Sequence, residues 1–116
     1  MTEEAKGRNF NVDELIAQIG MGNLFGISGG RVIIDGATYD SQYKTTQEVE
    51  LPVGYGYRVR INLDWDDTWK VSRIYVRKGK YAVKGVQTGV YFDAVGEVAY
   101  KASCFRNVEF GEKQSA

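Results

Sequence analysis

Hydrophobic and polar positions alternate without a break across residues 49–65. The odd-numbered positions are apolar, and the even-numbered positions are charged, polar, glycine or proline. A period of two with one polar face predicts antiparallel strands that pack on one side and face water on the other. As one strand the segment would extend ~56 Å, about three times the usual length. Since Pro52, Gly54 and Gly56 interrupt the polar face, we expect a turn at 52–56 between strands at 47–51 and 57–64.

The alternation continues after Asp66-Asp67, a pair typical of a turn. It resumes at Trp69 and Val71 but then moves to Ile74 and Val76, a change of phase that predicts a β-bulge near Ser72-Arg73. Lys78-Gly79-Lys80 predicts a tight turn before a strand at 81–86. Nearer the N-terminus, glycine turns separate further short strands, which we place at 24–27, 31–34 and 37–39.

Two segments have helical periodicity instead. Asn11 precedes Glu14 by three residues in a capping-box pattern, and apolar residues at helical spacing follow, so we expect a helix at 12–19 that ends at Gly20. A second apolar face predicts a helix at 92–103, in which Gly96 lowers helix propensity by ~1 kcal/mol relative to alanine.

Together these elements predict an α+β fold. The sheet is an antiparallel meander of five to seven strands, and the two helices, 12–19 and 92–103, pack on its apolar face. We expect one domain at 11–109, with a polar N-terminal tail at 1–10 and a polar C-terminal tail at 110–116.

Composition excludes several function classes. The 116 residues include no histidine and one cysteine, and 15 basic residues balance 15 acidic ones to a net charge of zero. Without histidine there is no Ser-His or Cys-His nucleophile and no imidazole-bound metal, so we expect no enzymatic activity and no cofactor. The chain has no apolar run long enough to span a membrane and no signal-peptide pattern, which predicts a cytoplasmic protein with no membrane partner.

The neutral total hides an asymmetry along the chain. Residues 1–67 carry six basic and eleven acidic residues, a net charge of −5, whereas 68–116 carry nine and four, a net charge of +5. Basic residues and aromatic rings interleave in the predicted hairpin 68–86, a pattern that suits phosphate contacts and base stacking. The residues expected to bind nucleic acid are Lys70, Arg73, Arg77, Lys78, Lys80 and Lys84 on phosphates, and Tyr75 and Tyr81 on bases.

Other interpretations stay open. The same charges suit a solvated strand face with lysines protecting an edge strand. Asp64, Asp66 and Asp67 are weak candidates for a divalent cation, because aspartates are also favoured in turns. The main alternative to nucleic-acid binding is a protein-binding module, such as an inhibitor of a host or defence factor, which could form a homodimer or a larger homo-oligomer.

From residue 19 onward the chain resembles small, mostly uncharacterised proteins encoded by phages of actinobacteria. The segments that carry the resemblance are IGMGNLFGISGGR (19–31), LPVGYGY (51–57), DTWKVSR (67–73) and GVYFDAVGEVAYKASC (89–104). These motifs consist mainly of glycines, turns and apolar helix positions. The resemblance implies a phage-type accessory protein that acts in the bacterial host cytoplasm by binding a host or phage macromolecule, and it supplies no catalytic or binding residue.

Overall fold

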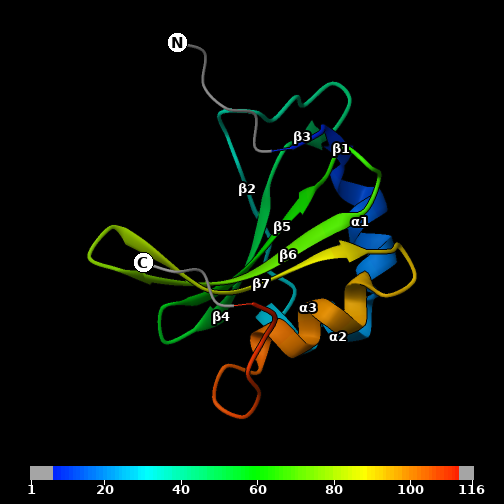
Figure 1. Cartoon of the computed structure of the whole chain (residues 1–116). Coiled ribbons are helices and arrows are strands. Elements are labelled where there is room, and N and C mark those ends of the chain that lie inside the picture. The colour runs from blue at the N-terminus through cyan, green and yellow to red at the C-terminus, as the bar shows by residue number, and fades with distance from the viewer. Residues whose placement is uncertain (1–6, 113–116) are drawn as a thin grey trace.

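The computed structural model describes residues 7–112 and contains a five-stranded antiparallel sheet (Figure 1). The strands lie in the order β2-β4-β5-β6-β7. Their bounds are Ile33–Ile34 for β2, Val49–Gly54 for β4, Tyr57–Leu63 for β5, Trp69–Arg77 for β6 and Lys80–Val90 for β7. Two further short strands, β1 (Phe10–Asn11) and β3 (Thr45–Thr46), pair with each other. The predicted antiparallel sheet is therefore confirmed, with β2 next to β4 in the strand order.

Helices α1 (Val12–Ile19), α2 (Met21–Ser28) and α3 (Val95–Ser103) cover one face of this sheet (Figure 1). The odd-numbered residues of β4 and β5 face these helices, and Leu51, Val59 and Ile61 are completely buried among them. Each such side chain contributes about 1.5–3 kcal/mol by leaving water. Among the described residues, no helix has the length and apolar character needed to span a membrane.

The helix at 12–19 has the predicted bounds and the predicted cap. The side-chain oxygen of Asn11 accepts a hydrogen bond of 2.9 Å from the Glu14 N–H. Gly20 ends the helix with a φ of 86°, a left-handed value that favours glycine.

A strand predicted at 24–27 is wrong, because these residues lie inside α2. The structure thus has three helices in residues 7–112 where the sequence indicated two. The chain turns at Gly20 and starts a new helix at once, which buries Leu24 and Ile27 against the sheet and leaves Met21 and Phe25 exposed. Because a short helix with apolar residues on both sides has no clear amphipathic pattern, periodicity did not identify α2. Residues 37 and 38 belong to a turn and residue 39 is irregular, so the strand predicted at 37–39 is wrong.

The predicted second helix, 92–103, begins later, at Val95, because residues 92–94 form a turn. Gly96 lies where α3 meets the end of α1. A Cβ atom at this position would collide with the carbonyl oxygen of Ile19 and the side chain of Asn23. Gly96 is therefore the residue that lets the two helices approach closely.

The β-bulge lies in a different strand from the one predicted. Strands β5 and β6 pair without interruption from Tyr57 opposite Tyr75 to Leu63 opposite Trp69. The pairing of β6 with β7 shifts register twice, and the extra residue is in β7 each time. One shift lies between Trp69 and Val71; at the other, Arg73 pairs with Gly85 and Ile74 pairs with Val83, so that Lys84 is the extra residue. Strand β6 therefore keeps its alternation, which turns the side chain of Arg73 toward the helices and that of Ile74 toward the opposite face.

The packed structure includes residues that the sequence indicated as tails. Phe10 is buried in the core and packs edge-on against Trp69, with ring centroids 5.0 Å apart. Phe110 is also buried, and Glu112 forms an antiparallel bridge with Val86 on the edge of β7. Packing and pairing thus include Phe10, Phe110 and Glu112, and residues 1–6 and 113–116 lie outside the described part of the chain.

Candidate nucleic-acid interface

Two hairpin tips lie side by side at one end of the sheet (Figure 1). The β4–β5 tip is Tyr55-Gly56 and the β6–β7 tip is Lys78-Gly79, and all four residues have positive φ, as tight hairpin turns require. The carbonyl oxygen of Gly56 accepts a hydrogen bond of 2.7 Å from the N–H of Val76. This bond joins the two hairpins where they leave the core.

Aromatic rings gather next to these tips, on the face of the sheet that carries the helices. Tyr57 stacks on Phe105 with centroids 4.0 Å apart and planes 8° from parallel. On β6, Tyr75 lies 5.0 Å from Tyr57, and Tyr55 lies 6.3 Å from Phe105. Tyr55 is 77% exposed. The rings form a continuous group from β6 across β5 to the segment after α3.

Two exposed cations lie over this group of rings. The guanidinium of Arg106 is 4.4 Å from the centroid of Tyr55, and the ammonium of Lys84 is 5.9 Å from the centroid of Tyr75. Such contacts hold a positive charge next to an aromatic face. We name this group the aromatic–basic surface; its members are Tyr55, Tyr57, Tyr75, Lys84, Phe105 and Arg106. A hollow of about 330 Å³ opens beside it, lined partly by Glu109.

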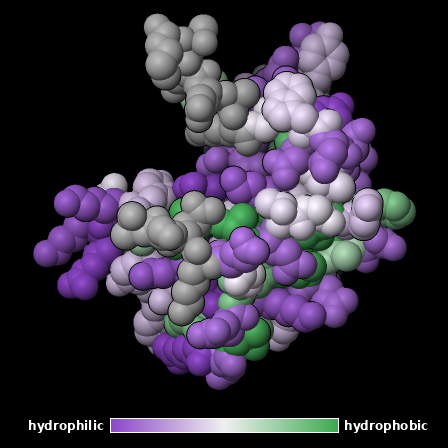
Figure 2. Space-filling model, viewed as in Figure 1, coloured by the Kyte–Doolittle hydropathy of each residue, from purple (hydrophilic) through white to green (hydrophobic). Residues whose placement is uncertain are grey.

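Five of the eight residues predicted to bind nucleic acid lie at this end of the sheet. Lys84 and Tyr75 belong to the aromatic–basic surface, and three cations are exposed near the β6–β7 tip: Arg77, Lys78 and Lys80. Figure 2 shows hydrophilic residues concentrated on this projecting hairpin.

The other three predicted residues lie elsewhere. Lys70 and Tyr81 are on the opposite face of the sheet. Arg73 is buried, and its Nε and Nη2 donate to the carbonyl oxygens of Ala102 and Lys101 at 2.7 and 3.0 Å. Burial lowers the pKa of Arg73. The prediction of a phosphate contact is wrong for Arg73, because β6 continues without a bulge and places its side chain beneath α3.

Sequence reasoning missed four residues of this surface. Alternation assigned Tyr55 and Tyr57 to the apolar core face, and helical periodicity did the same for Phe105. Both patterns describe which side of an element a residue occupies, but not whether another element covers it. Arg106 carried no signal beyond its charge, because its position over Tyr55 depends on how the chain turns after α3.

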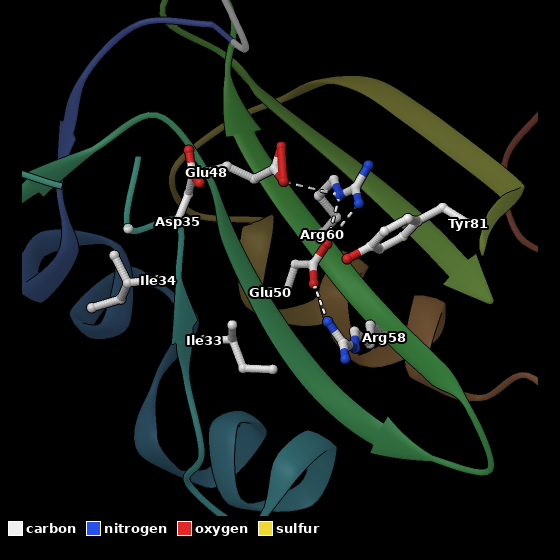
Figure 3. A pocket seen from close by; sticks show the side chains of 9 residues that line it. Ile33, Ile34, Asp35, Glu48, Glu50, Arg58, Arg60 and Tyr81 are labelled. Atoms are coloured by element: carbon white, nitrogen blue, oxygen red, sulfur yellow. Dashed lines mark hydrogen bonds and ion pairs between the residues drawn. The ribbon is translucent and has the colours of Figure 1, made fainter. Parts of the chain in front are cut away.

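Tyr81 contributes instead to a second site, on the sheet face away from the helices (Figure 3). We name it the concave pocket; it has a volume of about 350 Å³ and is lined by Ile33, Ile34, Asp35, Gly36, Glu48, Glu50, Arg58, Arg60 and Tyr81. Glu50 lies in its floor and pairs with both arginines, at 2.8 Å to Arg58 and 2.7 Å to Arg60. This cluster of charges occupies the polar face of the alternating segment.

The candidate cation ligands do not converge. Asp66 accepts hydrogen bonds from the side chain and the backbone of Thr68, which lower its pKa, and Asp67 pairs with Arg8. Asp64 is partly buried, which raises its pKa. Within residues 7–112, no cluster of three or more acidic or cysteine side chains could hold a metal ion.

Comparison with protein-family models, with curated proteins and with solved structures found no match to this chain. A function is therefore inferred from the chemistry of the residues themselves, chiefly the stacked rings and the exposed cations.

Proposed function

We propose that this protein is a non-enzymatic accessory protein of the phage type that binds single-stranded nucleic acid at the aromatic–basic surface. The observation that carries the proposal is the stacked group Tyr75, Tyr57 and Phe105, flanked by Tyr55 and by two exposed cations. Aromatic rings next to positive charge are the features with which proteins bind unpaired bases and their phosphates.

The positions of the rings and cations on the sheet suggest a path for a single strand of nucleic acid. Tyr55 and Arg106 lie at one side of the surface, and Lys84 lies at the other side over Tyr75. Beyond Lys84 the β6–β7 hairpin adds further exposed cations: Arg77, Lys78 and Lys80. Because positive charge continues from the rings to the hairpin tip, bases would stack near Tyr55 while the phosphates follow the hairpin.

The test is binding of a fluorescently labelled single strand of about ten nucleotides, measured by anisotropy at about 50 and 200 mM salt. We expect Tyr55→Ala to weaken binding by about 1–3 kcal/mol, the contribution of one stacked base. The triple variant Arg77→Gln, Lys78→Gln, Lys80→Gln should weaken binding and also reduce its dependence on salt.

Two control variants match these changes in chemistry. Tyr43→Ala removes another exposed tyrosine, and Lys101→Gln removes an exposed cation on α3. Both should bind like the unchanged protein. Absence of binding at about 50 mM salt, or equal binding by Tyr55→Ala and Tyr43→Ala, would contradict the proposal.

A further inference from the structure

The concave pocket has the size and the walls of a small-molecule site. Its volume of about 350 Å³ falls in the range of ligand pockets in proteins. Ile33 from β2 and Tyr81 from β7 stand on opposite sides of its charged floor (Figure 3). Both side chains are substantially exposed, at 38% and 55%. Apolar walls around a polar floor are typical of sites that hold a planar organic molecule.

The floor consists of two guanidinium groups that share the carboxylate of Glu50, and Arg60 also pairs with Glu48 at 3.2 Å. One oxygen of Glu50 accepts from Nη1 of Arg58, and the other accepts from Nε and Nη2 of Arg60. The Glu50 side chain is 9% exposed, whereas those of Arg58 and Arg60 are 30% and 22% exposed. The negative charge is therefore beneath the surface, and the positive groups border the cavity.

Arg58 has the greater capacity for a ligand. A guanidinium has five N–H donors, and Glu50 uses one of those of Arg58. The hydrogen bond to Glu50 raises the pKa of Arg58. Since the carboxylate already fixes its orientation, Arg58 can bind an oxyanion with little loss of side-chain freedom.

The pocket is also polarised along its length. Asp35 and Glu48 lie at one end and Arg58 lies at the other (Figure 3). Glu48 and Glu50 both pair with Arg60, at 3.2 and 2.7 Å, whereas Arg58 pairs with Glu50, so Arg58 keeps the larger share of its donors for an oxyanion. Arg60 lies 5.0 Å from the centroid of Tyr81 and holds the ring beside the cavity. A ring of the ligand can therefore lie against Tyr81 while its anionic group contacts Arg58.

We propose that the concave pocket binds a planar molecule that carries one oxyanion, a nucleoside monophosphate or a group of the same chemistry. The pocket lies on the opposite face of the sheet from the aromatic–basic surface, so this site goes beyond the proposed function and does not depend on it. The same group occurs as a free nucleotide and at the 5′-phosphorylated end of a strand.

The experiment is an NMR titration of the ¹⁵N-labelled protein with adenosine monophosphate, with adenosine and inorganic phosphate as the two partial ligands. We expect the monophosphate to shift the amides of Gly36, Arg58 and Tyr81 with saturation. Adenosine and phosphate should each bind at least about tenfold more weakly, because each makes one of the two contacts. Absence of saturable shifts at these amides, or equal binding of adenosine and the monophosphate, would overturn the proposal.

Variants assign the contacts. Arg58→Gln should weaken monophosphate binding at least about tenfold, whereas Lys101→Gln, which removes an exposed charge on α3, should leave it unchanged. Tyr81→Leu provides a second test at an exposed position; it removes none of the carboxylate–guanidinium pairs of the floor, and it should weaken binding of the monophosphate too. If a folded Arg58→Gln protein or the Tyr81→Leu protein binds the monophosphate as tightly as the unchanged protein does, the proposal that the pocket binds it is excluded.

A final comparison separates the two sources and the two proposals. The labelled protein is titrated with an oligonucleotide that carries a 5′-phosphate and with the same oligonucleotide without it. If only the phosphorylated oligonucleotide shifts the pocket amides, the end of a nucleic-acid strand is a ligand of the pocket. Shifts from the monophosphate alone identify a free nucleotide. If Tyr55→Ala leaves oligonucleotide binding intact while Arg58→Gln abolishes monophosphate binding, the proposed function fails and the pocket proposal is supported. If Tyr55→Ala weakens oligonucleotide binding while Arg58→Gln leaves monophosphate binding unchanged, the proposed function is supported and the pocket proposal fails.

Discussion

The Nε of Arg73 donates a buried hydrogen bond of 2.7 Å to the carbonyl oxygen of Ala102, which is 29 residues away in the sequence. A second bond of 3.0 Å runs from Nη2 to the carbonyl oxygen of Lys101. The last carbonyl groups of a helix have no partner within the helix and carry a partial negative charge. The Lys101 carbonyl also accepts the Cys104 N–H at 3.1 Å, so the guanidinium on β6 joins the local donors at the C-terminal end of α3 and attaches that end to the sheet.

Removal of this guanidinium should destabilise the fold. Arg73→Met keeps most of the aliphatic stem but removes the side-chain donor from the Ala102 carbonyl and leaves the Lys101 carbonyl with the Cys104 N–H, and we expect a loss of about 2–3 kcal/mol in the free energy of unfolding. Arg77→Met, the same change at the exposed end of β6, should cost no more than about 0.5 kcal/mol. Urea unfolding of both variants measures the difference, and equal stabilities would contradict the role assigned to Arg73.

Alanine at two helical glycines should have opposite effects. Gly96→Ala introduces a methyl group against the Ile19 carbonyl oxygen, and we expect a loss of about 1–3 kcal/mol despite the better helix propensity of alanine. Gly22, in α2, has open space around it, so Gly22→Ala should raise stability by up to about 1 kcal/mol. Thermal unfolding of the two variants gives the signs. A stabilised Gly96→Ala protein would show that α1 and α3 are not in close contact.

Glu50 should matter more than an exposed carboxylate. Glu50→Gln leaves Arg58 without its carboxylate and Arg60 with Glu48 alone, and a loss of about 2–3 kcal/mol is expected. Asp13→Asn breaks the solvent-exposed pair with Lys44 and should change stability by less than about 1 kcal/mol. Chemical denaturation at neutral pH compares them, and a Glu50→Gln protein as stable as Asp13→Asn would indicate that water screens the cluster fully.

Two aspartates in the turn at 64–67 have pKa values shifted in opposite directions. Hydrogen bonds from Thr68 lower the pKa of Asp66 below its ordinary value of 3.8. Ionised Asp66 therefore stabilises the fold above the pKa of the unfolded chain, and this contribution is lost as the pH falls through the folded value. Thr68→Val removes the side-chain donor and should raise the pKa of Asp66 in an NMR titration of the carboxyl carbon. An unchanged pKa would show that the hydroxyl has no effect.

Asp64 serves as the internal comparison in the same turn. Burial raises its pKa above 3.8, so its ionisation opposes folding, and the associated stability is lost as the pH rises through the folded value. Asp64→Asn should then leave the protein as stable as before, or more stable, above about pH 5. A marked loss of stability in this variant would show that the carboxylate has a favourable partner.

Local patterns in the chain were sufficient to predict its regular elements. The alternation at 49–65 identified β4 and β5, and the Asn11 cap identified α1, because both depend on neighbours along the same element. The same local rule failed at Trp65, an odd position of the alternating segment that is 74% exposed because β5 ends at Leu63. It also failed at residues 21–28, where a second helix follows directly after Gly20.

The sequence by itself determined the antiparallel sheet, its apolar face and the helices at 12–19 and near its C-terminal end, since side-chain periodicity and helix caps act over a few residues. It also determined that basic charge is concentrated in 68–86. The tertiary structure decided which of those charges face solvent. In the folded protein Arg73 is buried under α3, and Tyr81 lines the concave pocket. Phe105 stacks on Tyr57, and Arg106 lies over Tyr55. These placements depend on contacts between residues distant in the chain, which no periodicity within a single element can specify.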